Sequence, residues 1–349
     1  MIRLGIVGCN YGRNVLLPAF RLDPRCEVVA LAGTDAARTV ALAKQDGVPQ
    51  AFGDWAAMLE RDDIDAVAIA TPPRQQPAIA LRALALGKPV FAEKPMAGDL
   101  ESAAAMARQA GRLATMIDFG FTEVMAWRTA KAMLDRGAIG RLRHVAVTWQ
   151  VENASTRLRH RNWKTSAADG GGALGNLASH SMHYLEWFCG PIARLSAQLS
   201  GLPDDPSFET DVTLGIAFQS GASGSYAMSC ASYLGSGHRL EFYGEDGTLV
   251  LANPTADYMR GFDVTHARRP SKVLAQVPVE TDAVDGRFPA EARIAPVSRL
   301  ASRFLDAIEQ RSHAQPGFAE GYRAQLLLDA VRRSHALGRW IDTASAGTA

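Results

Sequence analysis

The first residues that could do chemistry form a glycine-containing loop near the start of the chain. A short apolar run, Ile2–Val7, ends at Gly8-Cys9-Asn10-Tyr11-Gly12, after which helix-compatible spacing returns. In such a strand–turn–helix unit the glycines let the backbone approach a pyrophosphate, and the N–H groups at the start of the helix attract its negative charge. The loop therefore predicts a dinucleotide site; an ordinary strand-to-helix turn is the alternative.

This loop departs from the usual G-x-G-x-x-G pattern at two places. Asn10 stands where the second glycine is expected, and the last glycine, Gly12, comes one residue early. Asparagine tolerates left-handed backbone geometry better than most residues do, so the first departure is compatible with the same turn.

The end of the second apolar run, Cys26–Ala32, bears on which dinucleotide is bound. NAD sites usually carry an acidic residue there that binds both ribose hydroxyls, whereas this chain has Gly33-Thr34. Glycine leaves space for a 2′-phosphate, Thr34 offers a hydroxyl donor, and Arg38 follows one helical turn later as a charged partner. Asp35 would repel that phosphate if it turned inward, but its position fits a helix N-cap. We therefore expect NADP(H) to be favoured over NAD(H).

The segments that follow alternate between strand and helix. Buried strands are expected at 66–70 and 90–92, with a helix at 79–86 between them. Such alternation predicts an α/β domain with a parallel sheet, in which ligands bind at the carboxyl ends of the strands. Thr71 and Pro72 directly follow the first of these strands, so we expect them to contact the cofactor.

Composition places the chain among ordinary globular proteins. It has 349 residues, 47% hydrophobic and 21% charged, a length that favours two cores over one. A formal charge of +1 gives no global field for nucleic acid or an anionic membrane. No apolar run approaches the roughly 20 residues that span a bilayer, and the scattered cysteines fit neither a zinc site nor a disulfide framework. We expect a cytoplasmic protein with a small-molecule substrate and with no nucleic-acid, membrane or metal partner.

At Glu93-Lys94-Pro95 the chain resembles the Gfo/Idh/MocA family, the relatives of glucose-fructose oxidoreductase and inositol 2-dehydrogenase. The resemblance rests on an ordered set of motifs: Ala70-Thr71-Pro72, Gly87-Lys88-Pro89-Val90, Glu93-Lys94-Pro95, Gly137-Ala138-Ile139-Gly140, Gly170-Gly171-Gly172-Ala173-Leu174, His180 and Tyr243-Gly244-Glu245-Asp246-Gly247. It implies a Rossmann domain over residues 1–120. It also implies a substrate-binding and oligomerisation domain over residues 121–349, an α+β domain with an open, mainly antiparallel sheet, whose helix at 321–337 packs back on the main body.

The resemblance also implies which residues carry the chemistry. Glu93 and Lys94 would lie at the cofactor, with Lys94 touching both nicotinamide and substrate oxygen, because hydride transfer at carbon needs a matching proton on oxygen. The family carries a second signature, in which an Asp is followed by a His four residues later and by another Asp three residues after that. The corresponding residues in this chain are Asn176, His180 and His183. If this segment is helical, the three side chains share one face. His180 would exchange a proton near neutral pH, whereas Asn176 can orient substrate but supplies no charge to keep Lys94 protonated.

Two further segments bear on the substrate. Gln76 stands where the family often has histidine, and Gly120-Phe121-Thr122 replaces an Asn-Tyr-Arg-like pattern, which argues against a common inositol or glucose enzyme. Arg161 and Lys164 lie beside Trp163 and can recognise a carboxylate or a nucleotide-linked diphosphate by charge-assisted hydrogen bonds and stacking. A solvated basic loop is the alternative for this segment.

These observations predict an NADP(H)-dependent oxidoreductase acting at a carbonyl or carbinol carbon of a sugar, sugar-nucleotide or related polyol, with an imine or other small carbonyl compound as the nearest variant. The alternative is a non-catalytic sensor or regulatory protein on the same fold, which Asn176 and the irregular loop would favour. Lys94 and His180 favour the enzyme, since folding demands neither. A metal site at His180 and His183 is not expected, because hydride chemistry needs no Lewis acid. Analogy with the family's open sheet predicts a homodimer or homotetramer.

Overall fold

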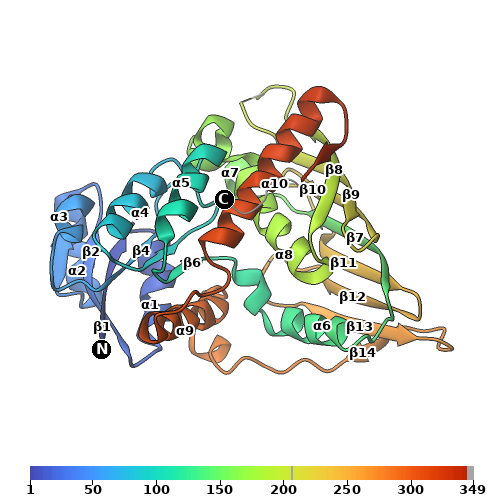
Figure 1. The fold of residues 1–349 in the computed structure, drawn as a ribbon, viewed down its shortest axis with the longest axis horizontal. Helices are drawn as coiled ribbons and strands as arrows, with labels where there is room; N and C mark the ends of the chain where they lie inside the picture. The colour runs from blue at the N-terminus through green and yellow to red at the C-terminus, as the bar shows by residue number, and fades with distance from the viewer. Residues whose placement is uncertain (206, 344–349) are drawn as a thin grey trace. The chain divides into compact units, whose positions relative to one another are not determined.

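The chain forms two compact units in a computed structural model that describes residues 1–205 and 207–343 (Figure 1). The first unit consists of residues 1–120 and 284–325, and the second of residues 121–205, 207–283 and 326–343. Each unit has its own sheet. No helix within the described ranges combines the length and the apolar composition needed to cross a bilayer.

A six-stranded parallel sheet forms the centre of the first unit. Its strands are β1 (Ile2–Val7), β2 (Cys26–Ala32), β3 (Gln50–Phe52), β4 (Ala66–Ile69), β5 (Val90–Ala92) and β6 (Thr115–Ile117). The spatial order β3-β2-β1-β4-β5-β6 reverses direction between β1 and β4. A crevice therefore opens at the carboxyl ends of these two strands. This order confirms the predicted Rossmann fold.

Helices connect these strands, and aspartate side chains cap the start of three of those described here. The helices are a π-helical turn (Gly12–Leu16), α1 (Leu17–Arg21), α2 (Ala36–Asp46), α3 (Trp55–Leu59), α4 (Gln76–Ala85) and α5 (Leu100–Ala110). Asp35 caps α2, because its Oδ1 accepts a hydrogen bond of 3.0 Å from the Arg38 backbone N–H. The N-cap role predicted for Asp35 is thus confirmed. Asp54 and Asp99 cap α3 and α5 in the same manner.

The chain returns to the first unit at α9 (Ile294–Gln310), which Figure 1 shows beside α1. The Phe304 ring packs edge to face on Phe20 and Phe91, with centroids 6.4 and 5.9 Å apart. Arg25, before β2, binds Asp306 of α9 at 2.6 Å. The sequence analysis assigned residues 284–325 to the second domain. They belong to the first unit, because the apolar face of α9 completes the Rossmann core.

The second unit is built on a nine-stranded sheet. Its strands are β7 (Leu142–Gln150), β8 (Ile192–Ser200), β9 (Asp211–Phe218), β10 (Ser223–Ser229), β11 (Gly237–Gly244), β12 (Gly247–Asn253), β13 (Asp263–Arg268), β14 (Ala275–Val277) and β15 (Ile341–Asp342), in the order β14-β13-β12-β11-β7-β10-β9-β8-β15. Only the central β7–β10 pair is parallel among these described strands. The predicted open, mainly antiparallel sheet is therefore confirmed.

The second unit also contains helices, two of which contribute aromatic side chains to a buried cluster. These helices are α6 (Met125–Asp135), α7 (Ala154–Arg157), a π-helical turn (Leu174–Ala178), α8 (Ser179–Cys189) and the part of α10 (Phe318–Leu337) that begins at Leu326. In this cluster the Trp149 and His238 rings stack with centroids 4.3 Å apart, and Phe121 meets Trp149 edge to face. The helix predicted at 321–337 corresponds to α10.

Candidate functional site

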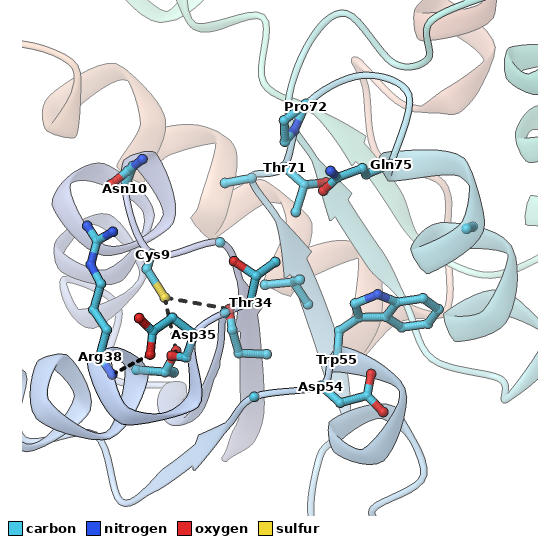
Figure 2. Close-up of a pocket in the computed structure, with 18 of the residues that line it drawn as sticks. Cys9, Asn10, Thr34, Asp35, Arg38, Asp54, Trp55, Thr71, Pro72 and Gln75 are labelled. Carbon is cyan, nitrogen blue, oxygen red and sulfur yellow. Dashed lines mark hydrogen bonds between the residues drawn. The ribbon is translucent and has the colours of Figure 1, made fainter. Parts of the chain in front are cut away.

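A cavity of about 700 Å³ opens at the carboxyl ends of β1, β2 and β4, in the crevice of the Rossmann sheet (Figure 2). Among its lining residues are several that the sequence predicted to bind the cofactor: Gly8, Cys9, Asn10, Thr34, Arg38, Thr71 and Pro72. These residues come from segments far apart in the sequence. The parallel sheet brings them together because its strands all end at the same edge.

The loop after β1 fits the requirements of a dinucleotide site. Gly8 has a φ of +116°, and a Cβ built on it would lie 2.3 Å from the Ala70 carbonyl oxygen, so only glycine lets this loop approach the end of β4. Thr71 Oγ1 is buried in the lining and has no hydrogen-bond partner among the described residues. Such a hydroxyl requires a polar partner, which a bound ligand would supply. The residues present therefore fit a dinucleotide.

Sequence reasoning missed several residues that line this cavity. Asp54 and Trp55 at the start of α3 and Arg74 and Gln75 before α4 all contribute to its wall. Figure 2 shows Trp55 across the cavity from Arg38. Asp54 and Trp55 come shortly after β3, and a recognised strand there would have indicated that they lie at the same edge of the sheet. The three residues of β3 are too few to form a recognisable apolar run.

Tyr11 and Gly12, also predicted to bind cofactor, lie outside this lining. The Tyr11 hydroxyl donates to Asp118 Oδ2 at 2.8 Å, and the Arg293 guanidinium lies over its ring at 5.0 Å from the centroid. A Cβ on Gly12 would lie 2.8 Å from Ile6 Cγ2. Gly12 therefore serves close packing of the first helical turn on β1, which is one of the roles of glycine in this type of loop.

The Glu93-Lys94-Pro95 segment follows β5 and is held by the buried side chain of Gln76 at the start of α4. Gln76 Nε2 donates to the Glu93 carbonyl at 2.9 Å and to the Pro95 carbonyl at 2.8 Å. The backbone N–H of Lys94 donates to Glu93 Oε2 at 3.1 Å. These bonds fix the backbone on both sides of Lys94. They also give a structural reason for the departure from histidine at position 76.

A buried carboxyl pair lies beside Lys94. Glu93 and Asp118 follow the adjacent strands β5 and β6, share a hydrogen bond and interact with the charge of Lys94. Burial, followed by the charge of Asp118, raises the pKa of Glu93 well above its ordinary value. Burial also raises the pKa of Asp118, although its hydrogen bonds with Glu93 and with the Tyr11 hydroxyl oppose this rise. Sequence reasoning missed Asp118, whose signal was an acidic residue directly after a short apolar strand.

The helix that carries the histidines differs from the predicted one. Residues 174–178 form a π-helical turn, and α-helical geometry starts only at Ser179, so Asn176 and His180 are not related by one regular α-turn. The segment is helical throughout, but its first turn is wider than an α-turn, and the shared face of Asn176, His180 and His183 stays a prediction. All three residues belong to the second unit, whereas Lys94 belongs to the first.

Glu209, which sequence reasoning also missed, holds the glycine run before this turn. Its Oε1 accepts from the Leu174 N–H at 2.9 Å, and its carbonyl accepts from the Ala173 N–H at 2.8 Å. Gly172 has a φ of +72°, and a Cβ on it would lie 2.3 Å from Glu209 Oε1. Burial raises the pKa of the Glu209 carboxyl. The glycines of this run thus admit the carboxyl group that fixes the start of the π-helical turn.

The two histidines of α8 have different surroundings. His180 is 7% exposed and packs edge to face on Phe121, with ring centroids 5.0 Å apart. His183 is partly exposed, yet the protein around it lowers its pKa to about 3, so its ring is neutral at physiological pH. Within the described ranges no three His, Cys, Asp or Glu side chains are grouped as metal ligands.

The basic loop before the glycine run has acidic partners. Arg161 lies 3.3 Å from Asp205, and Arg159 lies 2.9 Å from Asp204. The Lys164 ammonium lies 5.9 Å from the centroid of the Trp163 ring. Nearby carboxylates thus balance the charges of both arginines.

Comparison with known proteins identifies the family of both halves. Residues 2–121 match the model of an oxidoreductase family with an NAD-binding Rossmann fold, and residues 127–250 match the Gfo/Idh/MocA C-terminal domain. An uncharacterized oxidoreductase of Synechocystis is 29% identical over 97% of this chain and 95% of its own length. Levoglucosan dehydrogenase of Pseudarthrobacter phenanthrenivorans is 26% identical over 93% of this chain and 91% of its own.

A solved structure shows the same fold. A levoglucosan dehydrogenase in complex with NADH and levoglucosan superposes with a TM-score of 0.87 and 23% identity, covering 99% of this chain and 100% of the other. The two matched models together span most of the sequence, and the ordered motifs around Glu93-Lys94-Pro95 and His180 agree with them. The chain therefore belongs to the Gfo/Idh/MocA family of NAD-binding oxidoreductases.

Proposed function

We propose that this protein is an NADP(H)-dependent dehydrogenase or reductase that acts at a carbonyl or carbinol carbon of a sugar, sugar-nucleotide or related polyol. The observation that carries the proposal is the cavity at the β1–β4 crevice, whose wall has Gly33-Thr34 at the position of the ribose-binding acid of NAD sites. A relative named for levoglucosan supports the substrate class.

The preference for NADP(H) is supported by the groups around the end of β2. Asp35 lines the cavity, but its carboxylate is engaged as the cap of α2, and Gly33 carries no side chain. Thr34 and Arg38 also line the cavity, and Figure 2 shows the Arg38 guanidinium on the side where Asn10 lies. A hydroxyl donor and a guanidinium suit a 2′-phosphate, and the two aspartates of the lining, Asp35 and Asp54, each cap a helix.

In the proposed reaction, Lys94 moves or stabilises the proton at the substrate oxygen. The dinucleotide supplies or accepts the hydride when it is bound. Gln76 holds the Lys94 backbone in place, and the hydrogen-bonded Glu93–Asp118 pair lies next to it. The Asp118 carboxyl, whose charged form interacts with the charge of Lys94, is proposed as the electrostatic partner that Asn176 cannot be.

In the second unit, His180 is proposed to exchange a proton with the substrate and Asn176 to orient a substrate hydroxyl. The carboxylate of Glu209 fixes the turn that carries Asn176. His183, whose ring stays neutral, is proposed as a hydrogen-bonding contact and not as a second acid.

The test is turnover with a panel of sugars, polyols and their keto forms, each with NADP⁺ or NADPH and with NAD⁺ or NADH. We expect oxidation or reduction of at least one compound, with a higher kcat/KM for the phosphorylated dinucleotide. The Lys94→Ala variant should lose about 10² to 10⁴ in kcat while still binding dinucleotide. Lys44→Ala, a change at an exposed lysine of α2, is the matched control and should keep full activity.

Two results would overturn this proposal. Tight dinucleotide binding without turnover of any compound would indicate a sensor, which is the function that Asn176 at the family's acidic position favours. A higher kcat/KM with NAD(H) would overturn only the proposed preference for NADP(H), and the proposed oxidoreductase activity would stand.

We also propose a homodimer or homotetramer, which light scattering of the purified protein tests directly.

A further inference from the structure

We propose that Cys9 and Thr39 are specificity-determining residues, because together they keep position 33 free of any side chain and so exclude the acid that an NAD site needs there. This inference rests on the proposed preference for NADP(H). It adds to that proposal two residues that pack behind position 33.

The space around Gly33 is closed from two sides. A Cβ built on Gly33 would lie 2.5 Å from Cys9 Sγ and 2.6 Å from Thr39 Oγ1. Favourable contacts between such atoms need about 3.5 Å or more, so a side chain at position 33 must displace both atoms. Gly33 is not among the residues with positive φ. The obstacle to a side chain is therefore the lack of space, and not the backbone conformation.

Thr39 has little freedom to move away. Its side chain is 1% exposed, and its Oγ1 donates to the Asp35 carbonyl at 2.6 Å, within the first turn of α2. Asp35 also caps this helix through its carboxylate. Rotation of the Thr39 side chain would break this hydrogen bond next to the cap and leave its hydroxyl without an acceptor.

Cys9 is confined by the loop that binds the dinucleotide. Its Sγ lies 3.7 Å from the Ala32 carbonyl and 3.8 Å from Thr39 Oγ1, and these contacts are drawn in Figure 2. The preceding residue, Gly8, donates its N–H to the Ala32 carbonyl at 2.9 Å, which ties the loop to the end of β2. If a side chain at position 33 displaces the Cys9 sulfur, we expect the sulfur to turn toward the cavity, which Cys9 and Gly33 both line.

The consequence is a coupling between three positions that are distant in sequence. An acid placed at position 33 alone forces Cys9 or Thr39 into a new conformation and so disturbs the loop or the start of α2. Removal of the two obstructing atoms by Cys9→Ala and Thr39→Ala makes room for that acid. The choice of dinucleotide then depends on whether these two atoms are present behind position 33.

The experiment measures Kd values for NADP⁺ and NAD⁺ by calorimetry in the absence of substrate. We expect Gly33→Asp alone to weaken binding of both dinucleotides by about tenfold or more, as overpacking does. The triple variant Gly33→Asp/Cys9→Ala/Thr39→Ala should bind NAD⁺ more tightly than NADP⁺. Gly286→Asp is the matched control, because a Cβ there meets nothing within 4 Å, and it should leave both Kd values unchanged.

Circular dichroism shows whether each variant folds. If Gly33→Asp does not fold, Gly33→Ala, which adds the Cβ alone, takes its place, and Cys9→Ala/Thr39→Ala should restore the binding that it loses. Equal NAD⁺ affinity of the Gly33 variant with and without the two alanines would overturn the inference. Tighter binding of NAD⁺ than of NADP⁺ by the unchanged protein would instead overturn the proposed cofactor preference, so the two failures are distinguishable.

Discussion

The hydroxyl of Tyr11 donates to a carboxylate oxygen of Asp118 over 2.8 Å, and this bond connects the glycine loop after β1 with the residue that follows β6. Asp118 is 2% exposed and also shares a hydrogen bond with Glu93 after β5. Three strand ends of the Rossmann sheet thus meet in one buried polar group beside Lys94. We therefore expect the hydrogen bonds among Tyr11, Asp118 and Glu93 to contribute to the stability of the first unit.

Removal of the Tyr11 hydroxyl leaves a buried carboxylate with one donor fewer. Tyr11→Phe should lower the free energy of unfolding by about 1–3 kcal/mol, the cost of an unmet buried hydrogen bond. Urea denaturation measures this change. Tyr233→Phe, at a side chain that is 76% exposed, is the control and should alter the midpoint little. Equal midpoints for the two variants would contradict the role given to the Tyr11–Asp118 bond.

Gln76 fixes the Glu93-Lys94-Pro95 backbone through two hydrogen bonds from one nitrogen. Gln76→Leu leaves two carbonyls without this donor, so it should lower the free energy of unfolding by about 2 kcal/mol or more and reduce kcat more than it raises KM. Steady-state kinetics and urea denaturation measure both effects. Gln109→Leu removes a comparable amide bond to the Leu81 carbonyl at an exposed site and is the matched control. If Gln76→Leu behaved like Gln109→Leu, the positioning role would be refuted.

The raised pKa of Glu209 predicts a pH-dependent stability. The folded state holds this proton more tightly than the unfolded chain, whose ordinary pKa is 4.5. The resulting stability is fully present below about pH 4.5 and is lost as the pH rises through the folded-state pKa. Glu209→Gln cannot ionise, so the Tm difference should shift in favour of this variant as the pH rises from 4.5 to 8.

Calorimetry of the variant and of the parent protein across this pH range supplies the measurement. Glu27→Gln, a change at an exposed residue of β2, controls for the loss of one surface charge. A Tm difference between Glu209→Gln and the parent that stays constant with pH would show that the carboxyl does not titrate differently on folding.

His183 and His238 should both stay neutral at mildly acidic pH. Burial lowers the pKa of both His183 and His238 to about 3. The unfolded chain binds these protons near pH 6.5, so the stability that the neutral rings contribute is present above about pH 6.5 and is lost as the pH falls. Nitrogen-15 spectra of the imidazoles should show no titration of either ring between pH 5 and 8. A midpoint inside that range for either residue would contradict the burial described here.

The parts of the site that the sequence predicts are those set by neighbouring residues. Gly8 lies at a strand end before a helix, and Asp35 lies before the first turn of α2, so local patterns alone predict the cofactor loop and the cap. The alternation of strands and helices predicts the Rossmann sheet in the same way. The Gfo/Idh/MocA motifs then imply the second, mainly antiparallel sheet, which the structure confirms.

The missed features depend on contacts between distant segments. Asp118 becomes part of the site only because β6 pairs with β5, and Glu209 only because its loop reaches the glycine run before α8. The π-helical turn at Leu174–Ala178 leaves no mark in the spacing of apolar residues. The amphipathic pattern of α9 indicates a helix, but it does not indicate whether the apolar face of this helix packs on the core of the first unit or of the second.

Because α9 returns to the first unit, this unit cannot complete its fold until late in the synthesis of the chain. When the ribosome has completed β6, the nascent Rossmann segment still lacks the helix whose Phe304 packs on Phe20 and Phe91. The whole stretch from Phe121 to Ala283 must emerge before that flank of the core can close. Until then Phe20 and Phe91 lack this packing partner, so we expect the N-terminal segment to reach its full stability only late in translation.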